Sequence, residues 1–222
     1  IDYWMSEPDT GIYNAWNKAL PHVKGDWVYF LGADDYFCDS NVLPNMAQAL
    51  VKVPRDILVA YGKVNILSES SEYLYTCGLP WEKIDNKYRQ LMVLPHQGVF
   101  HRKEIFDTYG SFEESFRIAG DYELLLRYLK NNKAFFIPLE VAMMPLGGIS
   151  SDTKNSLKML WETRYAQKKN GLSVPGMYWI SALFRVYLRL VIWSILGEKK
   201  SRKLLDIGRG ILGKPPHWKK TR

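Results

Sequence analysis

The chain has 222 residues, of which 47% are hydrophobic and 14% aromatic. This composition is typical of a folded domain with a sizeable core and excludes an intrinsically disordered chain. Residues 1–197 carry 21 basic and 21 acidic side chains, so the formal net charge of +7 comes from nine basic and two acidic residues in 198–222. A neutral body argues against nucleic acid as a partner, whereas a basic tail predicts one local electrostatic contact. Two distant cysteines and four histidines without metal-ligand spacing favour a reduced, cytosolic setting.

Hydrophobic periodicity predicts alternating strands and helices along most of the chain. Strands are expected at residues 1–5, 26–31, 56–67, 72–77 and 134–144, with a strand edge at 95–100. Helices are expected at residues 12–23, 41–53, 103–109, 121–131 and 153–170. Residues 79–92 show no clear period and are expected to be irregular.

The strand expected at 26–31 is followed closely by two adjacent carboxylates, Asp34 and Asp35. In open α/β sheets, ligands bind outside the carboxyl ends of the strands. Paired Asp side chains at such a place suit a hard divalent cation that also binds phosphate oxygens. The alternative is that the two residues only start a turn or cap the following helix.

Residues 177–197 are almost all large and apolar, and Ser181, Arg185 and Arg189 form one polar stripe at a spacing of four. As a helix the segment would be about 30 Å long, which is enough to cross a bilayer. Two central arginines oppose insertion, so an amphipathic helix in the membrane interface, followed by the basic tail, is the expected arrangement. The arginines would then reach lipid phosphates. A helix packed on the protein's own core and a true span are the alternatives.

Four blocks in order along the chain resemble glycosyltransferase family 2, and above all its bacterial polysaccharide-assembly members. They are residues 6–18, 25–35, 95–100 and 119–124. The resemblance implies an α/β fold of the GT-A type with C-terminal amphipathic helices. Roughly the first 50–60 residues of the family's pattern, about one βαβ unit, have no counterpart here, so an N-terminally truncated domain is expected. The expected organisation is a catalytic domain at 1–150, a connecting helix at 151–174, and a membrane-associating helix with its basic tail at 175–222.

The resemblance also implies roles for three acidic residues. Asp34 would contact the ribose or sugar of the donor, and Asp35 would ligate Mn²⁺ or Mg²⁺ on its diphosphate. Asp121 stands where the family keeps the general base that takes a proton from the acceptor hydroxyl. From the residues alone, Asp121 could equally cap its helix. As a carboxylate that opens a helix, it is expected to be kept ionised by the helix dipole.

Four further residues are candidates by their place in the matched blocks. Asp9 and Lys18 are expected near the sugar nucleotide, and His96 and Gln97 near the acceptor or the leaving phosphates. Each has a structural alternative, since Asp9 suits a turn, Lys18 a solvated helix surface and His96 a core position.

The implied activity is metal-dependent transfer of one sugar, with inversion, from a nucleoside-diphosphate donor to a lipid-linked or saccharide acceptor. The expected donor is a UDP-sugar. The expected location is cytoplasmic and peripheral on the inner face of a bacterial cell membrane, through residues 177–222. The alternative is a catalytically inactive GT-A-like, membrane-associated partner of a glycan-assembly complex. The missing N-terminal elements favour this alternative, whereas Asp34, Asp35 and Asp121 disfavour it.

Overall fold

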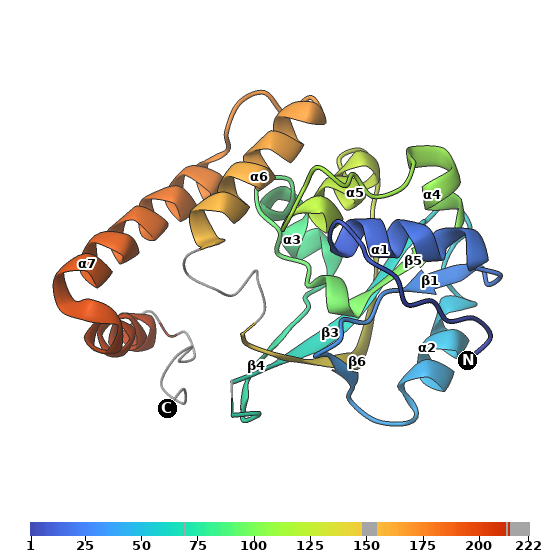
Figure 1. Cartoon of the computed structure of the whole chain (residues 1–222), viewed down its shortest axis with the longest axis horizontal. Coiled ribbons are helices and arrows are strands. Elements are labelled where there is room, and N and C mark those ends of the chain that lie inside the picture. The colour runs from blue at the N-terminus through green and yellow to red at the C-terminus, as the bar shows by residue number, and fades with distance from the viewer. Residues whose placement is uncertain (69, 148–154, 212, 214–222) are drawn as a thin grey trace.

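The computed structural model of the protein describes residues 1–68, 70–147, 155–211 and 213. A mixed sheet of six strands lies at its centre, in the order β1-β5-β3-β6-β2, with β4 paired to β3 (Figure 1). The strands are β1 Trp27–Tyr29, β2 Tyr36–Phe37, β3 Val59–Leu67, β4 Tyr73–Cys77, β5 Val99–Arg102 and β6 Phe135–Pro145. β3 and β6 are parallel, and every other pair within the described sheet is antiparallel.

Helices cover both faces of the sheet (Figure 1). The cluster on one face includes residues of α1 Ile12–Ala19, α3 Trp81–Tyr88, α4 Glu104–Tyr109 and α5 Gly120–Leu129, and the cluster on the other face includes residues of α2 Val42–Leu50. The side chains of β1 and of the next residue alternate between the two clusters, as the pleat of a strand requires. Val28 and Phe30 are buried on the α1 and α5 side, whereas Trp27 and Tyr29 pack on the α2 side.

The sheet is curled, and this curl positions the Asp34–Asp35 segment. β1 and β2 are consecutive in the chain but occupy opposite edges of the strand order. In a flat sheet those edges would be about 19 Å apart, at four strand spacings of about 4.8 Å each. The rings of Tyr29 and Phe37 nevertheless lie 5.4 Å apart. The short connection with Asp34 and Asp35 therefore bridges two edges that the curl brings together.

Two helices follow the sheet. α6 Ser156–Lys169 packs on α5 through buried residues that include Thr163, Ala166 and Gln167. α7 Met177–Ile211 extends away from the sheet (Figure 1). Its first part packs on α6 through Trp179 and Ala182, and it bends at Gly197, where φ is 71° and glycine is favoured.

The structure confirms the α/β class, the C-terminal helices and most of the expected elements, with two corrections. Residues 1–5 do not pair as a strand. Residues 81–88, expected to be irregular, form α3, which buries Trp81, Ile84 and Tyr88 at helical spacing. The strongly polar residues between these three obscure the period. Residues 153 and 154, at the start of the expected helix 153–170, lie outside the described residues.

Candidate functional site

Asp34 and Asp35 lie in the tight connection between β1 and β2. The Asp34 side chain is exposed and Asp35 is half-buried. The backbone N–H of Asp35 donates to the carbonyl of Gly32 at 3.2 Å. A Cβ atom at position 32 would lie 2.5 Å from Oδ2 of Asp35. Gly32 thus leaves room for the Asp35 carboxyl, and a third acid at position 32 would require that carboxyl to move.

The structure brings Gln97 to Asp35. Gln97 lies in the short 3-10 turn His96–Gly98, directly before β5, and its carbonyl accepts a hydrogen bond of 2.5 Å from the Tyr29 hydroxyl. Burial raises the pKa of Asp35, a hydrogen bond from the Gln97 side chain lowers it, and repulsion from Asp34 raises it again. The curl of the sheet therefore gathers residues from two separate sequence blocks around one carboxyl group.

Asp34, Asp35 and Gln97 supply the hard oxygen ligands that Mn²⁺ and Mg²⁺ prefer. The described residues hold no group of three or more His, Cys, Asp or Glu side chains that could bind a metal ion. A cation at Asp35 would thus need further oxygens from substrate phosphates or water, which is the usual way in which Mg²⁺ binds. A cation bound there would offset the repulsion between the carboxylates of Asp34 and Asp35.

Asp121 lies in the first turn of α5, at the other sequence-predicted position. It is partly buried, and its Oδ1 accepts a hydrogen bond of 2.8 Å from the Tyr122 N–H. Burial raises the pKa of Asp121 to about 6, against hydrogen bonds that lower it. The pKa of Asp121 is raised because desolvation outweighs the helix terminus, which favours the ionised form. The carboxyl is still ionised for the most part at pH 7, so it can accept a proton.

Tyr13 of α1 supports the start of α5. Its hydroxyl accepts a hydrogen bond of 2.8 Å from the Gly120 N–H and donates one of 2.8 Å to the Ile118 carbonyl. The same hydroxyl oxygen lies 3.4 Å from Oδ1 of Asp121. The N-terminal helix is thereby connected to the candidate base.

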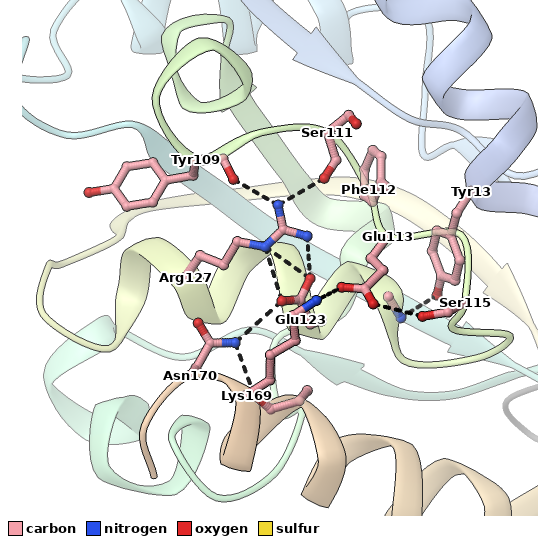
Figure 2. Close-up of polar contacts among 12 residues, drawn as sticks. Tyr13, Tyr109, Ser111, Phe112, Glu113, Ser115, Glu123, Arg127, Lys169 and Asn170 are labelled. Atoms are coloured by element: carbon pink, nitrogen blue, oxygen red, sulfur yellow. Dashed lines mark hydrogen bonds and ion pairs between the residues drawn. The ribbon is translucent and has the colours of Figure 1, made fainter.

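Arg127 connects α5 with the loop 110–119 that precedes it (Figure 2). Its guanidinium donates to the carbonyls of Tyr109 at 2.7 Å and Ser111 at 2.8 Å, and it pairs with Glu123, whose side chain is only 1% exposed. Lys169 at the end of α6 pairs with Glu113 in the same loop. The loop is thus held by two helices before it reaches Asp121.

Residues 3–107 match the family model described as glycosyl transferase family 2. This part of the chain is similar to glycosyl transferase family 2. An uncharacterized glycosyltransferase of Mycobacterium tuberculosis is 31% identical over 132 residues, which cover 56% of this chain and 47% of the relative. A PGL/p-HBAD biosynthesis glycosyltransferase of Mycobacterium bovis is 25% identical over 126 residues, covering 56% of this chain and 46% of the relative. The chain spans about half the length of the curated relatives it matches.

Two solved structures are also similar to the chain. TarS of S. aureus aligns with a TM-score of 0.49 at 13% identity, covering 84% of this chain and 33% of TarS. A mannosyltransferase of Pyrobaculum calidifontis, in complex with GDP-Man and Mn²⁺, aligns with a TM-score of 0.48 at 14% identity, covering 90% of this chain and 59% of that protein. At these scores neither similarity decides a question of chemistry. The mixed sheet with helices on both faces agrees with the α/β fold of the GT-A type that the sequence predicts.

Within the matched residues, Asp9 and Lys18 lie together but apart from Asp34 and Asp35. They line a cavity of about 410 Å³ between the N-terminal segment and α1, and neither Asp34 nor Asp35 lines it. Asp9 accepts a hydrogen bond of 2.9 Å from the Gly11 N–H, as a turn former does. Lys18 pairs with Glu7 at 2.6 Å, so its ammonium group is engaged by the protein itself.

His96 is buried beside the core of the matched residues. It is 6% exposed, and its ring stacks on Trp16 at 5.0 Å and lies 5.0 Å from the ring of His101. Burial lowers the pKa of His96 well below its usual value, and repulsion from His101 lowers it further. His96 is therefore a neutral core residue here, while its neighbour Gln97 reaches the candidate site.

The sequence reasoning missed the side chains that hold the loop before Asp121. Tyr13 and Asn17 come from one face of α1 at a spacing of four, and Asn17 bonds both the N–H and the carbonyl of Phe112. The signal that points to them is their place inside the block at residues 6–18. Glu162 of α6 also holds this loop, by accepting hydrogen bonds from the backbone N–H groups of residues 117–119. The sequence holds no signal for it, because a Glu on a polar helix is usually solvated.

Proposed function

We propose that this chain carries the donor site and the general base of a sugar transferase. The reaction would move one sugar from a nucleoside-diphosphate donor, a UDP-sugar, to a saccharide or lipid-linked acceptor. The observation that carries this proposal is the presence of two separate acidic sites on the helices and connections around one sheet. Asp34 and Asp35 offer paired carboxylates at one place, and Asp121 offers a single carboxyl with a pKa of about 6 at another.

Asp35 would hold Mn²⁺ or Mg²⁺ together with the donor diphosphate, with Gln97 beside it. When bound, such a cation neutralises the charge that develops on the leaving diphosphate. Asp34 is exposed next to it and would contact the ribose or sugar. Asp9 and Lys18 would contact the sugar nucleotide from the separate cavity that they line.

Asp121 would act as the base in a single displacement. The acceptor hydroxyl oxygen attacks the anomeric carbon as Asp121 takes its proton, and the carbon–oxygen bond to the diphosphate breaks with its electron pair. Because attack comes from the face opposite the leaving group, the configuration inverts. A pKa of about 6 suits this role, since the carboxyl is ionised at pH 7 and still basic enough to accept a proton.

The exposed apolar face of α7 supports contact with a membrane. Met177–Gly197 is long and apolar enough to cross a bilayer, and only 6% of an apolar 18-residue window within it is buried. Packing on α6 covers just one face, through Trp179 and Ala182, while Phe184 is 67% and Ile195 73% exposed on the opposite face. We propose an interfacial helix, followed by basic residues that meet an anionic leaflet of the cell membrane.

The two arginines of the polar stripe on α7 differ in their contacts, so the expectation that both reach lipid phosphates is corrected. Arg189 does not extend toward lipid, because its Nη2 donates a hydrogen bond of 2.5 Å to the Ser156 hydroxyl of α6. Arg185 remains exposed at the edge of the apolar face. Of the two arginines in the polar stripe, one thus connects α7 to the protein and the other is free to reach a phosphate headgroup.

Calorimetric titration of UDP into this chain, with and without Mn²⁺, tests the donor site. We expect metal-dependent binding that Asp35→Ala abolishes. The matched control Asp107→Ala, on the exposed face of α4, should bind as the wild type does. Metal-dependent binding of GDP in place of UDP would support the proposed site but identify the donor as a GDP-sugar. A folded chain that binds neither nucleotide would contradict the proposal and favour the inactive, membrane-associated partner.

A further inference from the structure

Glu162 of α6 lies against the residues that lead into α5. Its Oε2 accepts hydrogen bonds from three consecutive backbone N–H groups, those of Arg117 at 3.1 Å, Ile118 at 2.8 Å and Ala119 at 3.0 Å. Consecutive N–H groups that converge on one oxygen form an anion-binding concavity in the backbone. Because the acceptor is a carboxylate, these hydrogen bonds are of the strong, charge-assisted kind.

The next N–H along the chain is also engaged. The Gly120 N–H donates to the Tyr13 hydroxyl, so side chains of α6 and α1 bind four N–H groups in succession. Asp121 follows directly. The direction in which its side chain leaves the backbone is therefore set by Glu162 on one side and Tyr13 on the other.

The charge of Glu162 acts on the same group. Burial is the main reason why the pKa of Asp121 is raised, and repulsion from Glu162 adds to it. The other titratable groups that face Asp121 are the hydroxyls of Tyr13 from α1 and Tyr88 from α3, whose own pKa values are raised by burial and by the Asp121 charge. Among the described ion pairs, Glu162 has no cationic partner that would cancel its charge.

We propose that Glu162 is a positioning residue for Asp121, which it orients by fixing the backbone of residues 117–119. The inference rests on the proposed role of Asp121 as the base. It makes α6 part of the reaction machinery, although α6 lies outside the residues 3–107 that match the family model. The connecting helix expected from the sequence would thus do more than connect.

The variant Glu162→Gln tests this inference without a turnover assay. Carbon-13 NMR of the Asp121 carboxyl in the full chain should give a pKa below the wild-type value of about 6, because the repelling charge is gone. Amide hydrogen exchange at Ile118 and Ala119 should accelerate by about tenfold or more, since each loses a charge-assisted bond. The matched control Glu104→Gln, exposed at the start of α4, should change neither quantity.

A second variant separates charge from geometry. Glu162→Asp keeps the charge but withdraws it by one methylene, so exchange at residues 118 and 119 should accelerate while the pKa of Asp121 stays raised. An unchanged Asp121 pKa with unchanged exchange in Glu162→Gln would overturn the inference. Faster exchange throughout, including Val59 of β3, with the same Asp121 pKa would also overturn it, because Glu162 would then support general stability only.

The two proposals fail separately. If Asp121→Asn retains full turnover, the role of Asp121 as base is wrong, whereas the NMR titration still decides whether Glu162 controls that carboxyl. If the base role holds and the NMR titration shows no effect of Glu162, only the inference on Glu162 is wrong.

Discussion

The ring of Tyr13 occupies the space that a side chain at Gly120 would need. A Cβ atom at position 120 would lie 2.6 Å from Cε2 of Tyr13, and the Tyr13 hydroxyl accepts the Gly120 N–H at 2.8 Å. The two residues therefore fit as a pair, although 107 positions separate them. A side chain at position 120 would therefore displace the Tyr13 ring.

Tyr13→Phe should destabilise the chain and raise the pKa of Asp121 further. The Gly120 N–H would lose its partner in a buried place, which costs about 1–3 kcal/mol. The longer contact of 3.4 Å between the Tyr13 hydroxyl and Asp121, which lowers the Asp121 pKa, would also be lost. Urea unfolding measures the first effect and NMR titration of the Asp121 carboxyl the second. Tyr165→Phe, at an exposed position on α6, serves as the control. A variant of wild-type stability would contradict the assigned hydrogen bonds.

Turnover should fall as the pH drops below about 6. The pKa of Asp121 is raised to about 6, and the protonated carboxyl cannot take a proton from the acceptor. The value of kcat/KM should thus fall about tenfold per pH unit on the acid side and stay level just above pH 7. Asp121→Asn should lower kcat by about 10²–10⁴-fold. Asp107→Asn is the matched control, and an acid limb that persists in Asp121→Asn would assign it to another group.

Arg127→Met should be strongly destabilising, because Glu123 would remain buried without a counter-charge. Removal of one partner of a buried pair costs about 3–5 kcal/mol. The double variant Arg127→Met/Glu123→Leu should recover much of this loss, as both charges are then gone. By contrast, Lys18→Met removes the exposed pair with Glu7 and should change the free energy of unfolding by less than about 1 kcal/mol. A urea-denaturation cycle of the wild type, Arg127→Met, Glu123→Leu and the double variant measures the coupling, and additive effects would refute it.

His101 should make the chain sensitive to acid. Burial lowers the pKa of His101 to about 4 in the folded chain, whereas an unfolded His has a pKa near 6.5. The unfolded state therefore binds more protons below pH 6.5, and stability is lost as the pH falls. Between pH 7 and pH 5 the loss should be about 2 kcal/mol.

The variant His101→Phe tests this expectation. It should remove most of that pH dependence, as followed by urea unfolding at a series of pH values. His22→Gln, at an exposed position, should leave the pH dependence unchanged. An equally steep fall in both variants would point to His96 or to carboxyl groups instead.

Phe184→Glu should weaken membrane binding. Phe184 is 67% exposed on the apolar face of α7, and burial of a Phe side chain contributes about 1.5–3 kcal/mol. Binding to vesicles that contain phosphatidylglycerol should therefore fall about tenfold or more. The control Leu43→Glu changes an exposed apolar residue of α2 and should bind normally. Sedimentation with these vesicles and with pure phosphatidylcholine, at low and high salt, also tests the electrostatic part. No binding by the wild type would rule out the interfacial helix.

Local patterns in the sequence were sufficient to predict many of the elements. The strand and helix periods predicted β3, β4, α2 and α5 close to their observed positions, because burial on one face imposes a period that the residues display. The adjacent acids Asp34 and Asp35 and the matched block around Asp121 also stood out from the sequence alone. Helix α3 was missed because three buried residues, among them Trp81, lie between strongly polar neighbours.

Only the tertiary structure decided what surrounds each acid. The curl of the sheet brings Gln97 to Asp35, and no local pattern records a contact between positions 62 residues apart. Desolvation raises the pKa of Asp121 although the helix dipole lowers it. This desolvation depends on neighbours from α1, α3 and α6. The contacts of Glu162 also depend on tertiary structure. Its carboxylate accepts hydrogen bonds from three backbone N–H groups that it reaches only when α6 packs beside α5. Periodicity determines which face of an element is buried, whereas the packing of distant segments determines the charge and direction of a side chain in the site.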